Sequence, residues 1–149
     1  MGIKIIDRNK RAGYDFFLFD KFEAGMVLKG PEVKSVRGGK VNISDAFITI
    51  DGNGEAWAHN IYIGHYEFGN INNPPENRSR KLLLNREEIK KIFEQQRRQK
   101  YSIVPTIIYF KNSTIKLEIA LAKGKKLHDK RASESKRDVE RHLKQGQFD

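Results

Sequence analysis

The clearest pattern in the chain is an alternation of apolar and polar residues near its C-terminal end. The stretch IKLEIAL, at residues 115–121, places isoleucine and leucine on one face of an extended chain and Lys116, a glutamate and an alanine on the other. This period of two predicts a strand that is buried on one face. The preceding run IVPTIIYF, at residues 103–110, predicts a second strand, joined to the first by KNST in a hairpin. Since Pro105 has no backbone N–H, we expect a sheet edge or a bulge there.

A second hairpin is predicted in the first half of the chain. Segments 46–50 and 55–63 flank Asp-Gly-Asn-Gly at residues 51–54, which are residue types that accept the positive φ of tight turns. Segments 14–22 and 25–28 are the remaining strand candidates. The total is about six short strands, and their spacing predicts a small antiparallel barrel or sandwich.

Two helices are predicted between these strands. Residues 30–39, GPEVKSVRGG, have a proline at the first helical position, an acid in the first turn, an arginine in the last turn and glycines beyond it. In the second helix, from Asn85 to about Arg98, Asn85 is a candidate cap and Glu88 follows in capping-box spacing. The apolar stripe of this second helix consists of Ile89, Ile92 and Phe93.

The C-terminal stretch is charged and poor in apolar residues. The sequence SESKRDVERHLK, from Ser133, permits a helix, but Val139 and Leu143 are its only large apolar residues. Ordering a backbone costs about 1–2 kcal/mol per residue, which two such side chains do not offset. We therefore expect residues 1–122 to form one domain, and residues 123–149 to form a basic tail that is disordered when free and helical on a partner.

The charge of the chain points to an anionic partner. Lysine and arginine number 29 against 19 acidic residues, a net charge of +10, and the sequence pI is near 9.8. From Lys123 onward there are nine basic and five acidic residues, while the preceding 122 residues hold 20 and 14. Because body and tail both carry an excess of positive charge, either part could meet nucleic acid.

No constellation of residues predicts catalysis, a metal or a cofactor. The chain has no cysteine, which removes disulfides, thiolate metal sites and cysteine nucleophiles. Its histidines do not fall at metal-ligand spacing, and no phosphate-binding glycine loop is present. Asp45 and Glu55 could join a hydrolytic site only if the fold brought them together.

Nothing in the sequence predicts a membrane protein. No apolar run approaches the roughly 18 residues of a membrane span, and the start, MGIKIIDRNKRAGYD, has no signal-peptide core. We therefore expect a cytoplasmic protein.

Several motifs occur in an order that resembles one protein family. They are NKRA at residues 9–12, FEAGMVLKGPEVKSVRGGKVNISDAFI at 22–48, RKLLLNREEI at 80–89, YFKN at 109–112 and ALAKGKKLHDKR at 120–131. The set resembles the bacterial transfer-messenger RNA-binding family, also called the SsrA-binding or small protein B family. The resemblance implies an OB-like antiparallel β-barrel with flanking helices. It also implies a monomeric adaptor, without catalysis of its own, that binds the tRNA-like domain of transfer-messenger RNA (tmRNA) and delivers it to stalled ribosomes.

The resemblance assigns four residues to RNA binding: Glu23, Leu83, Asn85 and Lys116. Lys116 lies on the outward face of its predicted strand, where contact with a phosphate is natural. Glu23 would accept a hydrogen bond from a base or ribose, or would orient a nearby arginine. From residue type alone, Leu83 is predicted to lie in the core.

The resemblance also assigns residues of the tail to the ribosome. They would enter the empty mRNA channel and the rRNA of the decoding centre, and they are Gly124, Lys125, Lys126, His128, Asp129, Lys130 and Arg131. One segment departs from the family: Pro74-Pro75-Glu76-Asn77 stands where the family usually has His-Asp-Pro, so the path of that loop does not follow from the resemblance.

Two other functions fit a small basic protein. One is a general single-strand-binding module whose stacking platforms would be Tyr14, Phe16, Phe17, Phe19, Trp57 and Tyr62. The other is a structural protein of the ribosome.

Overall fold

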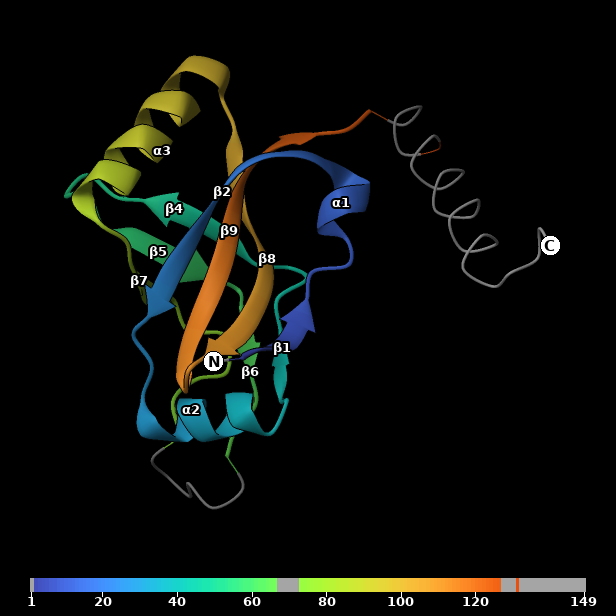
Figure 1. The fold of residues 1–149 in the computed structure, drawn as a ribbon, viewed down its shortest axis with the longest axis vertical. Coiled ribbons are helices and arrows are strands. Elements are labelled where there is room, and N and C mark those ends of the chain that lie inside the picture. Colours follow the sequence, from blue (N-terminus) through green and yellow to red (C-terminus); the bar gives the residue numbers. More distant parts are fainter. Residues whose placement is uncertain (1, 67–72, 127–130, 132–149) are drawn as a thin grey trace.

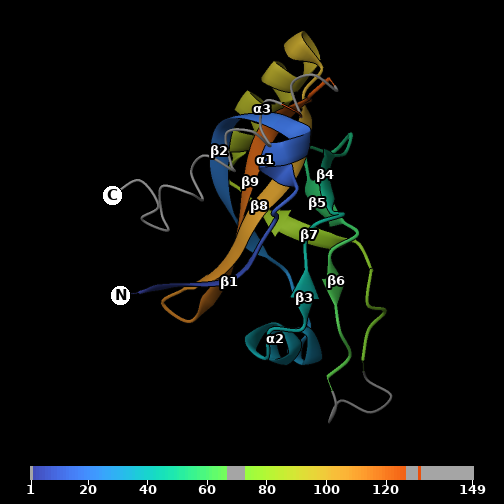
Figure 2. The same cartoon turned by 90° about the vertical axis from the view of Figure 1, so that its right-hand side faces the viewer.

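The computed structural model describes residues 2–66, 73–126 and 131, and its core is an antiparallel sheet of seven strands (Figures 1 and 2). Their order across the sheet is β1 (Ile3–Arg8), β8 (Ser102–Lys111), β9 (Thr114–Gly124), β2 (Phe16–Met26), β7 (Arg80–Leu83), β5 (Ala56–His59) and β4 (Phe47–Ile50). A smaller sheet pairs β3 (Val41–Asn42) with β6 (Tyr62–Ile63). The helices of the described part are α1 (Ala12–Asp15), α2 (Gly30–Arg37) and α3 (Arg86–Gln99), and none of them is long and apolar enough to cross a membrane.

The hairpin predicted from the alternating pattern is confirmed as β8 and β9. Its turn consists of Asn112 and Ser113, which have φ values of 51° and 75°, as a tight two-residue hairpin turn requires. The isoleucines and leucines of 115–121 are buried. Pro105 lies at a shift in the β8–β9 register and beyond the part of β8 that pairs with β1, so the proline marks a bulge where one edge of β8 is unpaired.

The far end of β9 is buried on both faces. Ala122 packs with Ala12 of α1 and with Val104, and Ala120 is also fully buried. The prediction of a half-buried strand therefore holds only for the part of β9 that α1 does not cover.

Other elements differ from their predictions. The strand expected over 55–63 is divided, because Asn60 adopts a φ of 60° and the chain then pairs as β6 with β3. The segments 14–22 and 25–28 form the single strand β2, while Tyr14 belongs to α1. β1, β3 and β7 were not predicted, because each is too short or too charged to show a clear period.

The expected OB-like barrel is not confirmed: the fold is mainly β with few helices, and the described sheet is open. Its two ends are β1 and β4. β4 packs against β8, but the two strands are not hydrogen-bonded neighbours in the described sheet.

A buried ion pair fixes α2 to the large sheet. Glu32 of α2 accepts from Arg80 Nε at 2.7 Å and from Arg78 Nε at 3.0 Å, and Arg80 also donates to the carbonyl oxygen of Ile61 at 2.6 Å. Glu32 is 2% exposed and Arg80 is fully buried. The arginines after the Pro74-Pro75 segment are thus structural.

The two predicted helices are confirmed, with Pro31 at the start of α2.

Candidate nucleic-acid interface

Three of the four residues assigned to RNA lie on the outward face of adjacent strands. In the register, Gly25 of β2 pairs with Lys116 of β9 on one side and with Leu83 of β7 on the other. Glu23 lies two residues from Gly25 on β2 and therefore shares its face. With strands spaced about 4.8 Å apart, Lys116 and Leu83 lie roughly 10 Å apart across the sheet. We call this set, with Asn85, the outer-face row.

A tyrosine and a lysine hold the carboxylate of Glu23. The buried Tyr109 donates its hydroxyl to Glu23 Oε2, and Lys111 Nζ lies 3.4 Å from both carboxylate oxygens. The hydrogen bond from Tyr109 is the largest cause of a lowered pKa of Glu23, and Lys111 and Lys116 also lower it, against an opposing effect of burial. Burial and the contact with Glu23 raise the pKa of Tyr109 above its usual range. At neutral pH, Glu23 is therefore an ionised, oriented acceptor.

Lys116 and Leu83 both face outward from the sheet. Lys116 has no ion pair with another residue of the described ranges. Leu83 is 54% exposed, so its placement in the core from residue type alone is wrong. The reason is the alternation along β7, in which Leu82 fills the inward position.

Asn85 has a structural role next to this row. Its side-chain oxygen accepts from Glu88 N at 2.8 Å, and Glu88 Oε1 accepts from Asn85 N at 3.3 Å, which confirms the predicted capping box. Because the cap uses the amide oxygen, the NH₂ group is the part of this side chain that remains available to a ligand.

Sequence reasoning did not assign Tyr109 and Lys111 to the site. The signal was present, since a tight hairpin places Tyr109 directly opposite Lys116 and puts Lys111 on the same face. Gly25 was also missed. A Cβ at this position would lie 3.4 Å from Leu83 Cβ, in van der Waals contact, so this position lies directly beside Leu83.

The start of the predicted tail is part of the folded body. Gly124 pairs with Phe16, and Lys125 N donates to the carbonyl oxygen of Asp15 at 2.9 Å. The ammonium of Lys125 donates to the carbonyl oxygen of Gly13 at 2.9 Å and lies 5.0 Å from the ring centroid of Phe17. Lys126 and Arg131 are exposed, whereas His128, Asp129 and Lys130 lie outside the described residues.

The candidate stacking aromatics do not form one platform. Trp57 donates its indole N–H to Asp51 at 3.0 Å, Phe19 packs on Tyr101, and Phe16 packs beneath α1. The two acids considered for a hydrolytic site have separate basic partners, Arg11 for Asp45 and Lys81 for Glu55. No group of three potential metal ligands occurs among the described residues.

A basic, mainly antiparallel β protein with an unpaired lysine and an exposed leucine across adjacent strands fits the class of nucleic-acid-binding proteins. The family model described as SmpB protein matches residues 6–147. The chain therefore belongs to the SmpB protein family.

Individual relatives agree with this assignment. The SsrA-binding protein of Geotalea uraniireducens is 52% identical over 143 residues, which cover 96% of this chain and 94% of that protein. The SsrA-binding protein of Thermoanaerobacter pseudethanolicus is 47% identical over 150 residues, 98% of this chain and 96% of that one. A solved structure described as "tmRNA-SmpB: a journey to the center of the bacterial ribosome" matches with a TM-score of 0.67 and 38% identity, covering 81% of this chain and 85% of that one.

Proposed function

We propose that this protein is an RNA-binding adaptor of ribosome rescue by trans-translation. It binds the tRNA-like domain of tmRNA and delivers it to stalled ribosomes, where the incomplete peptide is tagged and the ribosome is released. The names of its relatives, SsrA-binding protein, and the tmRNA-SmpB structure support these partners. The observation that carries the proposal is the outer-face row, in which an unpaired Lys116 and an exposed Leu83 flank Gly25. The protein acts by binding and is not an enzyme.

Each residue of the row has a distinct chemical role in this proposal. Lys116 contacts a phosphate, and Leu83 packs on a ribose or the face of a base. Glu23, held by Tyr109, accepts from a base amino group or a ribose hydroxyl. Asn85 offers its amide NH₂ while its oxygen caps α3.

The tail supplies the second contact. Residues 1–122 act as the tmRNA-binding domain, and residues 123–149 act as a basic extension whose first residues complete β9. Within this extension, residues 124–126 and 128–131 meet the rRNA of the mRNA channel and decoding centre. Support comes from the sequence, because the tail carries nine basic residues against five acidic ones. Its stretch from Ser133 permits a helix that would form in the channel, where an anionic wall would offset the cost of ordering.

Fold and location follow the same proposal. The packing of β4 on β8 brings the two ends of the sheet near one another, which supports an OB-like arrangement even though the ladder is open. A partner on the ribosome supports a cytoplasmic location, and a single copy of the chain suffices for the proposed contacts.

The test compares Lys116→Glu with Lys4→Glu, which makes the same charge change at an exposed position of β1 outside the row. Lys116→Glu should weaken binding of the tRNA-like domain. It should also reduce the slope of log affinity against log salt concentration (the salt slope) by roughly 0.7–0.9 for each phosphate that the protein no longer neutralises. Lys4→Glu should leave this slope unchanged. Filter binding over a series of salt concentrations measures both. Equal slopes would remove Lys116 from the interface, and equal affinity of the wild type for an unstructured RNA of the same charge would favour a general single-strand binder.

A further inference from the structure

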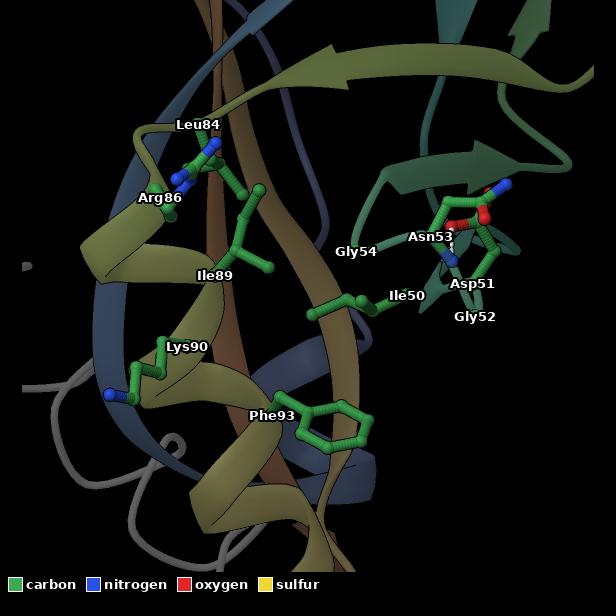
Figure 3. A pocket seen from close by; sticks show the side chains of 10 residues that line it. All are labelled: Ile50, Asp51, Gly52, Asn53, Gly54, Leu84, Arg86, Ile89, Lys90 and Phe93. Atoms are coloured by element: carbon green, nitrogen blue, oxygen red, sulfur yellow. Dashed lines mark hydrogen bonds between the residues drawn. The ribbon is translucent and has the colours of Figure 1, made fainter.

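An apolar groove separates α3 from the turn between β4 and β5. It encloses about 580 Å³ and is lined by residues of the turn and of the N-terminal half of α3. Figure 3 shows the side chains of Ile50, Leu84, Ile89 and Phe93 pointing into the space between them. We call it the helix–hairpin groove.

Packing among the described residues does not fill this groove. Of the apolar stripe predicted on α3, Ile92 is fully buried in the core, whereas Phe93 remains 44% exposed. On the other side, a Cβ added at Gly52 would meet no atom within 4 Å. The turn therefore leaves an apolar helix face in water, which is unfavourable unless something else covers it.

The groove and the outer-face row share one segment of the chain. In the segment LLNR, Leu83 and Asn85 belong to the row, while Leu84 and Arg86 line the groove. Leu83 points outward and Leu84 packs against the core, so the row and the groove lie on different sides of this segment. A ligand as large as a folded RNA can reach both sides of so short a segment, which allows one ligand to contact both places.

The polar groups at the mouth suit a nucleotide. Arg86 is exposed and has no ion pair with another described residue. The carboxylate of Asp51 is already occupied, since it accepts from the backbone N–H groups of Asn53 and Glu55 at 2.9 Å and from the indole of Trp57 at 3.0 Å. A free guanidinium beside apolar walls matches a ligand that joins a flat ring to an anion.

We propose that the helix–hairpin groove receives one unpaired base of the bound RNA, with Phe93 against the base and Arg86 on an adjoining phosphate. The Asn53 side chain, which lies at the turn, faces the polar edge of that base. This inference rests on the proposed binding of the tRNA-like domain and adds to it a site that reads a single unstacked nucleotide.

The first experiment removes the base and the ring separately. The tRNA-like domain of tmRNA is prepared as a set in which each unpaired nucleotide in turn is abasic, and each RNA is titrated with the full-length protein and with Phe93→Ala. One abasic position should lower the affinity of the wild type about tenfold, and Phe93→Ala should lower the affinity for intact RNA by a similar factor. When Phe93→Ala is combined with that abasic RNA, the two losses should not add. Phe47→Ala is the matched control, because this phenylalanine is 43% exposed on β4 outside the groove.

The second experiment tests the phosphate. Arg86→Ala should lower the salt slope by roughly 0.7–0.9, whereas Arg98→Ala, about three helical turns further along α3, should not. The proposal is overturned if Phe93→Ala and Phe47→Ala bind every RNA alike. It is also overturned if the groove variants bind RNA normally and are impaired only in ribosome association, because a protein segment would then be the occupant. Failure of the broader function would be recognised separately, because Lys116→Glu would then also bind the RNA as the wild type does.

Discussion

Replacing Glu32 by glutamine would test how strongly the buried ion pair holds the fold. The substitution keeps the shape of the side chain but removes the charge that faces Arg80 and Arg78. Glu32 accepts from the backbone N–H of Lys29 at 2.9 Å as well, so it joins the start of α2, the strand β7 and the loop before it. Glutamine cannot satisfy both arginines, and the fully buried Arg80 would keep an uncompensated charge.

The expected loss of unfolding free energy is large for a substitution that replaces one carboxylate oxygen by an NH₂ group. Removing one partner of a buried ion pair typically costs about 3–5 kcal/mol of unfolding free energy. For a chain of this size, about 2–4 °C of Tm accompanies each kcal/mol, so Tm should fall by about 10 °C. Urea and thermal unfolding of the full-length protein, followed by circular dichroism, measure both quantities.

The control is Glu55→Gln, which removes the same charge from an exposed pair. Glu55 lies 3.5 Å from Lys81, and both side chains are 41% exposed. Such a surface pair is worth about 0–1 kcal/mol. If Glu32→Gln and Glu55→Gln unfold at the same urea concentration, the buried pair does not carry the stability assigned to it.

The pH dependence gives an independent check. Burial alone would raise the pKa of Glu32, but hydrogen bonds from Arg78, Lys29 N and Arg80 outweigh it and lower the pKa below its ordinary value of 4.5. A lowered pKa contributes stability that is present above the ordinary value and is lost as the pH falls through the folded-state pKa. The difference in stability between the wild type and Glu32→Gln should therefore be constant near neutral pH and shrink once the pH falls below 4.5.

Three further outcomes are expected. Tyr109→Phe should raise the pKa of Glu23 toward its ordinary value and weaken RNA binding severalfold; an NMR pH titration in which this pKa stays low would show that the lysines suffice. Asn85→Ala should lower the unfolding free energy by about 1 kcal/mol through removal of the helix cap, whereas Asn85→Asp should stay close to the wild type in urea unfolding, and equal destabilisation would argue against the cap. Truncation after Lys126, which preserves the β9 pairing, should keep most RNA affinity but abolish peptide tagging in a reconstituted translation system; tagging by the truncated chain would refute the role of the tail.

The sequence correctly predicted those elements whose structure depends on residues that are close together in the chain. The β8–β9 hairpin, the bulge at Pro105 and the cap at Asn85 depend on neighbours within about ten residues, and all three are confirmed. The alternation also put Lys116 on the outward face without help from the fold.

Features that depend on distant strands could not be predicted in this way. Leu83 is exposed because Leu82 faces the core, and a four-residue strand is too short for its period to show which leucine is buried. The pairing of Glu23 with Tyr109 joins residues 86 positions apart. The open sheet likewise depends on the strand order, in which β4 and β8 are not neighbours, rather than on any one segment.

The length of β9 has a consequence for how the protein could work between two partners. Lys116 lies near one end of this continuous strand and Gly124 at the other, eight residues further on (Figure 1). At about 3.3 Å per residue, these positions are separated by about 26 Å of hydrogen-bonded backbone. The strand therefore acts as a stiff spacer: an RNA gripped at one end and a channel entered from the other must themselves lie about that far apart.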